Sequence, residues 1–192
     1  MTGIVVFAAE GAMTANLFNL NLLGVMVIAL ISALGGGMIR DVLIGSTPPV
    51  SLLDGRYIAL ACTTGILTYV GDTGVHQIPP ELLVVLDAAG LGLFAVAGVE
   101  KAMQFNFRPF VAMLLGTLNA VGGGVIRDVL LNRVPVIMQT DFYASAALTG
   151  TFVVFASRRL GLSYGASGVL GGLACFGLRM FSFLFDWHFP RP

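Results

Sequence analysis

The sequence predicts an all-α integral membrane protein with seven transmembrane helices, arranged as two inverted three-helix repeats plus one extra helix. Three observations predict this fold class. The 192 residues are 57% hydrophobic and 10% charged, with a mean hydropathy of +0.92, whereas soluble domains carry about 25% charged residues. Apolar segments long enough to span a bilayer, about 20 residues, recur along the chain. Residues 34–43 return in closely similar form 87 residues later, at 121–130.

The first half of the chain is expected to hold three spans. The first covers residues 3–18, and three asparagines (Asn16, Asn19 and Asn21) then mark a short turn. The second covers 22–44 and ends at a loop with Pro48 and Pro49, because proline cannot continue a helix. The third covers 56–70, and the polar stretch 71–80 closes this half.

The second half is expected to hold four spans. The fourth covers 81–100 and is followed by a polar link, 101–108. The fifth covers 109–131 and begins with Pro109, a residue that helices accept at their first position. The sixth covers 141–155 and ends before Arg158 and Arg159. The seventh covers 164–187, where Trp187 suits the membrane interface.

The repeated segment divides the chain into two related halves. Each repeat holds three spans, so the second repeat enters the membrane from the opposite side, as in an inverted-topology repeat. We therefore expect a single transmembrane domain over residues 1–192. Its first repeat covers about 3–70, its second repeat about 81–156, and the seventh helix about 164–187.

The repeated segment carries a glycine triplet in each half. Each internal glycine weakens a helix by roughly 1 kcal/mol relative to alanine, so three together favour a kink or an unwound turn. Broken backbone at membrane depth is tolerated only inside protein or along a wet cavity. We predict that the triplets form hinges beside a pore, and the alternative is tight helix packing. The six glycines are Gly35, Gly36, Gly37, Gly122, Gly123 and Gly124.

An Arg-Asp pair follows each triplet, Arg40-Asp41 in the first half and Arg127-Asp128 in the second. Neighbouring residues do not face each other on a helix. Each arginine is therefore expected to find a partner elsewhere, such as the aspartate of the other repeat, and to line or gate a pore. The other interpretation places both pairs at the membrane edge, with the arginines reaching to water.

Other polar residues also fall inside the apolar runs. Glu10 lies in the middle of the first span, and Ser32 and Asn119 occupy corresponding positions before the two triplets. These three side chains are candidates for a polar lining of the same cavity. Asp87 lies near the head of the fourth span, and Arg179 in the seventh is expected at the interface.

Several function classes find no support in the sequence. It contains no serine elbow, phosphate-binding loop or nicotinamide fingerprint, so an enzyme is not expected. Cys62 and Cys175 are not clustered with His76 or His188 at ligand spacing, so no metal site and no cofactor are expected. The formal net charge of zero gives no electrostatic case for nucleic acid.

Two copies of Gly-Gly-Gly-x-x-Arg-Asp-x-Leu in a seven-span chain of this length resemble the prokaryotic trimeric intracellular cation channels. That family shares its fold with bacterial membrane proteins proposed in some cases to take up glycine. The resemblance covers about residues 3–187. It implies a homotrimer in a prokaryotic inner membrane, surrounded by lipids, with one pore per subunit between the repeats. The implied ions are potassium and sodium.

The resemblance also implies roles for the repeated residues. The six glycines would form kinks in the second and fifth spans, with Arg40, Asp41, Arg127 and Asp128 beside them. The Lys-Glu-Val motif through which animal members are controlled is absent from this sequence.

The sequence therefore favours a monovalent cation channel. The main alternative is a secondary transporter for a small solute such as glycine, because inverted repeats with broken helices also build carriers. A purely structural membrane protein would have no need of paired intramembrane charges. The basic residues divide almost evenly between the two sides, so the orientation in the membrane stays open.

Overall fold

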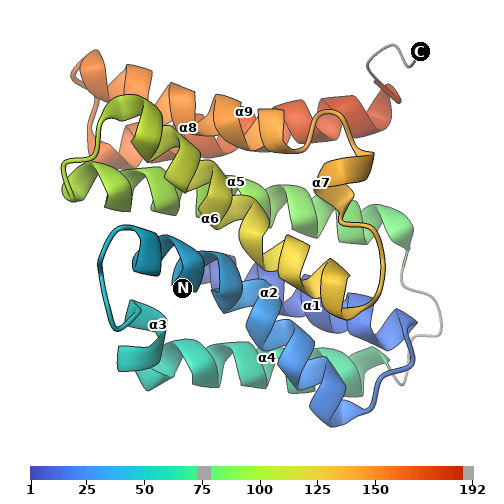
Figure 1. The fold of residues 1–192 in the computed structure, drawn as a ribbon. Helices are drawn as coiled ribbons and strands as arrows, with labels where there is room; N and C mark the ends of the chain where they lie inside the picture. Colours follow the sequence, from blue (N-terminus) through green and yellow to red (C-terminus); the bar gives the residue numbers. More distant parts are fainter. Residues whose placement is uncertain (73–78, 188–192) are drawn as a thin grey trace.

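A computed structural model describes residues 1–72 and 79–187, and all regular structure in that part of the chain is α-helical. Figure 1 shows the arrangement of the helices. Their bounds are α1 (Thr2–Leu17), α2 (Leu22–Leu43), α3 (Val50–Leu53), α4 (Gly55–Asp72), α5 (Pro80–Gln104), α6 (Pro109–Leu130), α7 (Val136–Gln139), α8 (Ala144–Arg159) and α9 (Tyr164–Leu184).

Each of the seven predicted spans corresponds to one long helix, with ends that differ by a few residues. Four of these helices, α2, α5, α6 and α9, are long and apolar enough to cross a membrane, and α1 is a shorter apolar helix. The four-residue helices α3 and α7 were not predicted. Each begins after a proline at the N-cap position, Pro49 or Pro135, and they follow α2 and α6 respectively.

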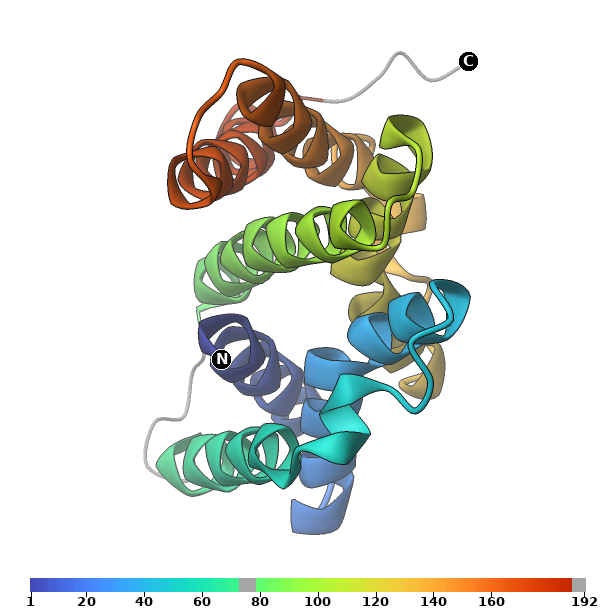
Figure 2. The ribbon, with the colours of Figure 1, turned by 90° about the vertical axis from the view of Figure 1, so that its left-hand side faces the viewer.

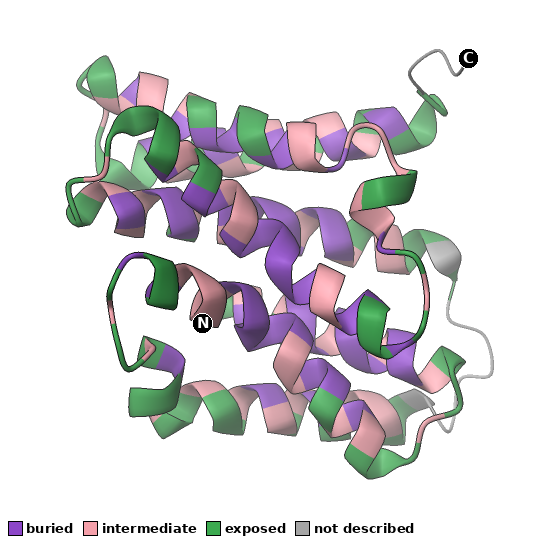
Figure 3. Cartoon of the chain, viewed as in Figure 1, coloured by how far each residue is buried: buried purple, intermediate pink, exposed green. Residues whose placement is uncertain are grey.

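The long helices form two groups of three. Helices α1, α2 and α4 contact one another, and so do α5, α6 and α8, while α9 packs on α5 and α8. The groups meet through α2 against α6 and α1 against α5. Figure 2 shows α9, α5, α1 and α4 stacked in one row, with α2 and α6 beside it. Buried residues gather where the groups meet, and exposed ones lie on the outer faces (Figure 3).

The glycine triplets lie where α2 crosses α6. A Cβ atom at Gly36 would overlap the carbonyl oxygen of Asn119, and one at Gly123 would overlap that of Ser32. Both helices continue without a break through their triplets. The structure thus shows tight packing at the triplets, and the unwound turn that the sequence favoured is absent from both helices.

The two helix groups also make matching contacts elsewhere, in which residues 87 positions apart in the sequence play the same part. The rings of Phe7 and Phe94 stack with their centroids 5.0 Å apart, at the contact of α1 with α5. A Cβ atom at Gly3 would meet the Phe94 ring, and one at Gly90 would meet the Phe7 ring. Residues at equivalent positions of α1 and α5 therefore make the same contacts on the opposite helix. Since Gly3 meets Phe94 and Gly90 meets Phe7, α1 and α5 run antiparallel.

Replacing Gly36 by alanine should lower the free energy of unfolding by roughly 1–3 kcal/mol, because the new methyl group has no room against the Asn119 carbonyl. Gly37 provides a matched control, since its nearest neighbour to an added Cβ is the Asn119 Oδ1, at 3.7 Å. Gly37→Ala should leave stability unchanged or raise it by up to about 1 kcal/mol. The measurement is the Tm in detergent, and equal shifts for both variants would contradict the close contact.

Candidate functional site

Two clusters of charged side chains lie at opposite ends of the molecule, because α2 and α6 cross with their carboxyl ends pointing apart (Figure 1). The first cluster is built on Asp41. Its Oδ1 accepts hydrogen bonds from Arg40 Nη2 at 2.7 Å and Lys101 Nζ at 2.8 Å. Its Oδ2 accepts the backbone N–H of Val50 at 3.1 Å. Asp41 therefore holds α3 and α5 to the end of α2.

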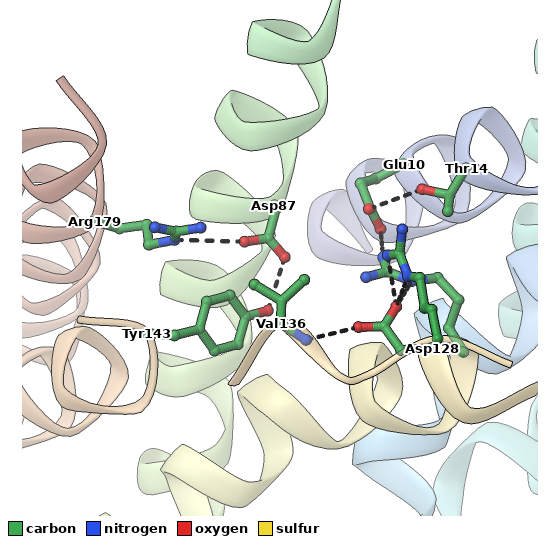
Figure 4. A network of polar contacts seen from close by, with 9 residues as sticks. Glu10, Thr14, Asp87, Asp128, Val136, Tyr143 and Arg179 are labelled. Carbon is green, nitrogen blue, oxygen red and sulfur yellow. Dashed lines mark hydrogen bonds and ion pairs between the residues drawn. The ribbon is translucent and has the colours of Figure 1, made fainter. Parts of the chain in front are cut away.

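The second cluster is built on Asp128 in the corresponding way. Its Oδ1 accepts from Arg127 Nε at 2.9 Å and Arg133 Nη2 at 2.6 Å, and its Oδ2 accepts the Val136 N–H at 3.0 Å. Arg127 Nη1 also donates to Glu10 of α1, and Glu10 accepts the Thr14 hydroxyl at 3.2 Å. Figure 4 shows this network. One arginine thus joins the two helix groups.

The expectation that each arginine finds a partner away from its neighbouring aspartate was wrong for Arg40 but correct for Arg127, which also bonds Glu10 of the other helix group. Arg40 and Arg127 each bond the aspartate that follows them. Both aspartates lie near the end of a helix and turn toward the loop beyond it, so the long arginine side chain can bend around to reach them. Arg127 is 2% exposed and Arg40 is 11% exposed, so neither is a solvated anchor at the membrane edge.

A third set of buried polar groups lies next to the second cluster. The Tyr143 hydroxyl donates to Asp87 Oδ1 at 2.7 Å, and Arg179 Nε lies 3.8 Å from Asp87 Oδ2 (Figure 4). Arg179 is 5% exposed, so its predicted interfacial position was wrong. No partner for Asp87 could be named from the sequence. The signal available was the carboxylate itself, since a charge inside the membrane needs a partner.

The two clusters differ at several corresponding positions, among them Thr14 and Lys101, Ser46 and Arg133, and Glu10 and Ala97. Glu10 corresponds to Ala97 at the spacing of 87 residues, so the second cluster has a carboxylate where the first has a methyl group. A cavity of about 460 Å³ opens beside the first cluster. Polar or small residues on its wall include Gly37, Arg40, Asp41, Ser51, Ala97 and Lys101.

Ser32 and Asn119 lie between the two clusters, at the crossing of α2 and α6. The Asn119 amide donates to the Phe94 carbonyl at 2.5 Å. In the described part of the chain, Ser32 Oγ and Asn119 Oδ1 are buried and have no hydrogen-bond partner. Asn119 Oδ1 lies close to Gly37, which borders the cavity. These two oxygen atoms are therefore free to accept hydrogen bonds from water.

The described residues hold no group of three or more His, Cys, Asp or Glu side chains arranged for a metal ion. His76 and His188 lie outside the described residues. The carboxylates of the second cluster and of Asp87 instead face arginines.

The apolar outer faces, the long helices and the paired internal charges together define a helical integral membrane protein. The chain belongs to the family described as glycine transporter, whose model matches residues 1–73 and 84–159. The inner membrane protein YadS of Escherichia coli is 32% identical over all of this chain and 92% of its own length. A membrane protein of Streptomyces coelicolor is 43% identical over all of this chain and 88% of its own length.

Solved structures with the same fold are cation channels. A TRIC cation channel is 36% identical, with a TM-score of 0.89 over 99% of this chain and 93% of that one. The trimeric intracellular cation channel orthologue from Rhodobacter sphaeroides is 29% identical, with a TM-score of 0.90 over 96% of this chain and 95% of that one. The resemblance inferred from the repeated motif is thereby confirmed.

Replacing Arg127 by alanine should destabilise the protein by roughly 3–5 kcal/mol, because Glu10 and Asp128 would stay buried without their shared cation. The double variant Glu10→Gln/Arg127→Ala should recover part of the loss, since it removes one unpaired charge. Arg56→Ala is the matched control, because Arg56 is 81% exposed and binds only Asp54 beside it. The Tm in detergent measures the stability of all three variants. Similar Tm values for Arg127→Ala and Arg56→Ala would refute the buried network.

Proposed function

We propose that this protein is a monovalent cation channel for potassium and sodium, working as a homotrimer with one pore in each subunit. The observation that carries the proposal is the cavity beside the first cluster, which is lined by residues of both helix groups. The structures with the same fold are cation channels. The proposal includes seven membrane spans and an inverted repeat over about 3–70 and 81–156, with the seventh helix at about 164–187.

The proposed path begins in the 460 Å³ cavity and passes the crossing of α2 and α6. The glycine triplets let the two helices pack closely there, and Ser32 and Asn119 supply oxygen atoms beside the crossing. Arg127 and Glu10 then close the path at the second cluster. Arg40 and Asp41 border its open end, and Asp128 fixes Arg127 at its closed end. The hinge role of the triplets stays part of this proposal.

A secondary transporter for a small solute is the second candidate, and the description of the matched family favours glycine as the solute. A cavity beside one cluster and a buried ion pair at the other also fit alternating access. The two candidates differ in kinetics. A channel passes potassium down its gradient without saturating at low concentration, whereas a carrier saturates and exchanges.

Weakening the closure should raise potassium flux in liposomes. Glu10→Gln removes the negative charge that faces Arg127, so the contact loses its ion-pair attraction and should open more often. Gly36→Leu should abolish flux, because its side chain would collide with the Asn119 backbone and force α2 and α6 apart at the crossing. Potassium flux unchanged in both variants would refute the proposed path, and labelled-glycine exchange without potassium flux would favour the carrier.

Assembly can be tested separately. The proposed homotrimer predicts that crosslinking in mild detergent gives a ladder that stops at three bands, with a native mass three times that of the 20.1 kDa chain plus detergent. The orthologue of similar fold from Rhodobacter sphaeroides is a trimeric channel. A monomer or dimer by native mass measurement would refute the trimer.

A further inference from the structure

The cavity beside the first cluster has an excess of positive charge. The charged residues on its wall are Arg40, Lys101 and Asp41, which amount to two cations and one carboxylate. The Asp41 oxygens are already occupied, since Oδ1 accepts from both cations and Oδ2 accepts the Val50 N–H. In the described part of the chain, the ammonium of Lys101 makes only this one hydrogen bond. The wall therefore offers donors that nothing in the protein uses.

A buried hydroxyl points to a ligand at the same place. Ser51, in the second position of α3, lines the cavity and is 8% exposed. Its Oγ has no hydrogen-bond partner among the described residues. A buried polar atom without a partner destabilises a protein by about 1–3 kcal/mol, so such atoms normally have one, and a molecule bound in the cavity would supply it to Ser51.

The second cluster shows what such a partner looks like. There the arginine that corresponds to Arg40 is Arg127, and it receives a carboxylate from Glu10 in addition to its neighbouring aspartate. The residue that corresponds to Glu10 is Ala97, which is exposed on the cavity wall. The first cluster thus has the arginine and the space, and it has no carboxylate at the position of Glu10.

We propose that the cavity binds a small carboxylate, held by Arg40, Lys101 and Ser51 in the place that Glu10 occupies at the other end. The inference rests on the inverted repeat of the proposed function, which supplies the correspondence of Glu10 with Ala97. Bound there, the carboxylate balances the excess positive charge at the mouth of the cation path. A simple organic acid and the carboxylate of an amino acid such as glycine present the same group to the site.

The test is calorimetric titration of the purified protein with sodium acetate, against sodium chloride at the same ionic strength. Acetate should bind, and ethylammonium chloride should not. Ser51→Ala and Lys101→Gln should each weaken acetate binding by about tenfold, the equivalent of one hydrogen bond to a charged group. Either of two results would overturn the proposal. The first is a binding heat for acetate equal to that for chloride, and the second is acetate binding that neither variant weakens.

A built-in carboxylate gives a second, sharper test. Ala97→Glu should occupy the site from within, raise the Tm in the absence of acetate and abolish acetate binding. Ala97→Gln is the matched control, because it adds the same volume without the charge and should not raise the Tm. An equal Tm for the two variants would overturn the proposal. The Ser51 and Lys101 variants decide the question if Ala97→Glu does not fold.

Titration with glycine separates the two sources of the carboxylate. Glycine that binds as tightly as acetate shows that the site recognises the carboxylate alone, and tighter binding shows that it also recognises the ammonium group. Glycine and acetate both failing to bind would overturn the proposal. Acetate binding without potassium flux would refute the channel and leave the site standing, whereas flux without binding would refute only the site.

Discussion

Two helices can approach as closely as α2 and α6 do only where neither has a side chain at the contact. Gly36 faces the backbone of Asn119, and Gly123 faces that of Ser32. In lipid, where helices gain little from hiding apolar surface, such backbone contact is a main source of association. The contact also fixes the place of the charged residues, because Arg40 and Arg127 follow their triplets by one turn of helix. The packing and the site therefore depend on the same glycines.

The charged clusters hold the chain together at the carboxyl ends of α2 and α6. Each aspartate binds its own arginine, a cation from the chain beyond and the first N–H of a short helix. In the first cluster the further cation is Lys101, and in the second it is Arg133. A charge in the bilayer centre is disfavoured by about 2.5–3.5 kcal/mol on insertion scales, so these groups are stable inside the protein only as a set. A movement at either end must displace the set together.

The sequence predicted the parts of this structure that depend on local pattern. Long apolar runs located the long helices, and the repeated motif located the crossing and both aspartates. It failed where partners are distant in the chain. Glu10 and Arg127 are 117 residues apart, and Lys101 and Asp41 are 60 apart. No local rule pairs them, and the rule for helix neighbours excluded the Arg-Asp bonds that do form. Arg179 was misplaced for the same reason, since its burial beside Asp87 depends on how α9 packs on α5.

The reciprocal contacts between the two halves have the form of an isologous interface, in which one surface patch meets a second copy of itself. In a homodimer built from one such half, any substitution would appear at both ends of the molecule at once. Joining the halves in one chain removes that constraint, because each position can then change alone. Glu10 and Ala97 are a difference of this kind. The covalent link between the halves thus allows one end to hold a carboxylate of the protein's own beside its arginine while the other end holds Ala97 beside a cavity.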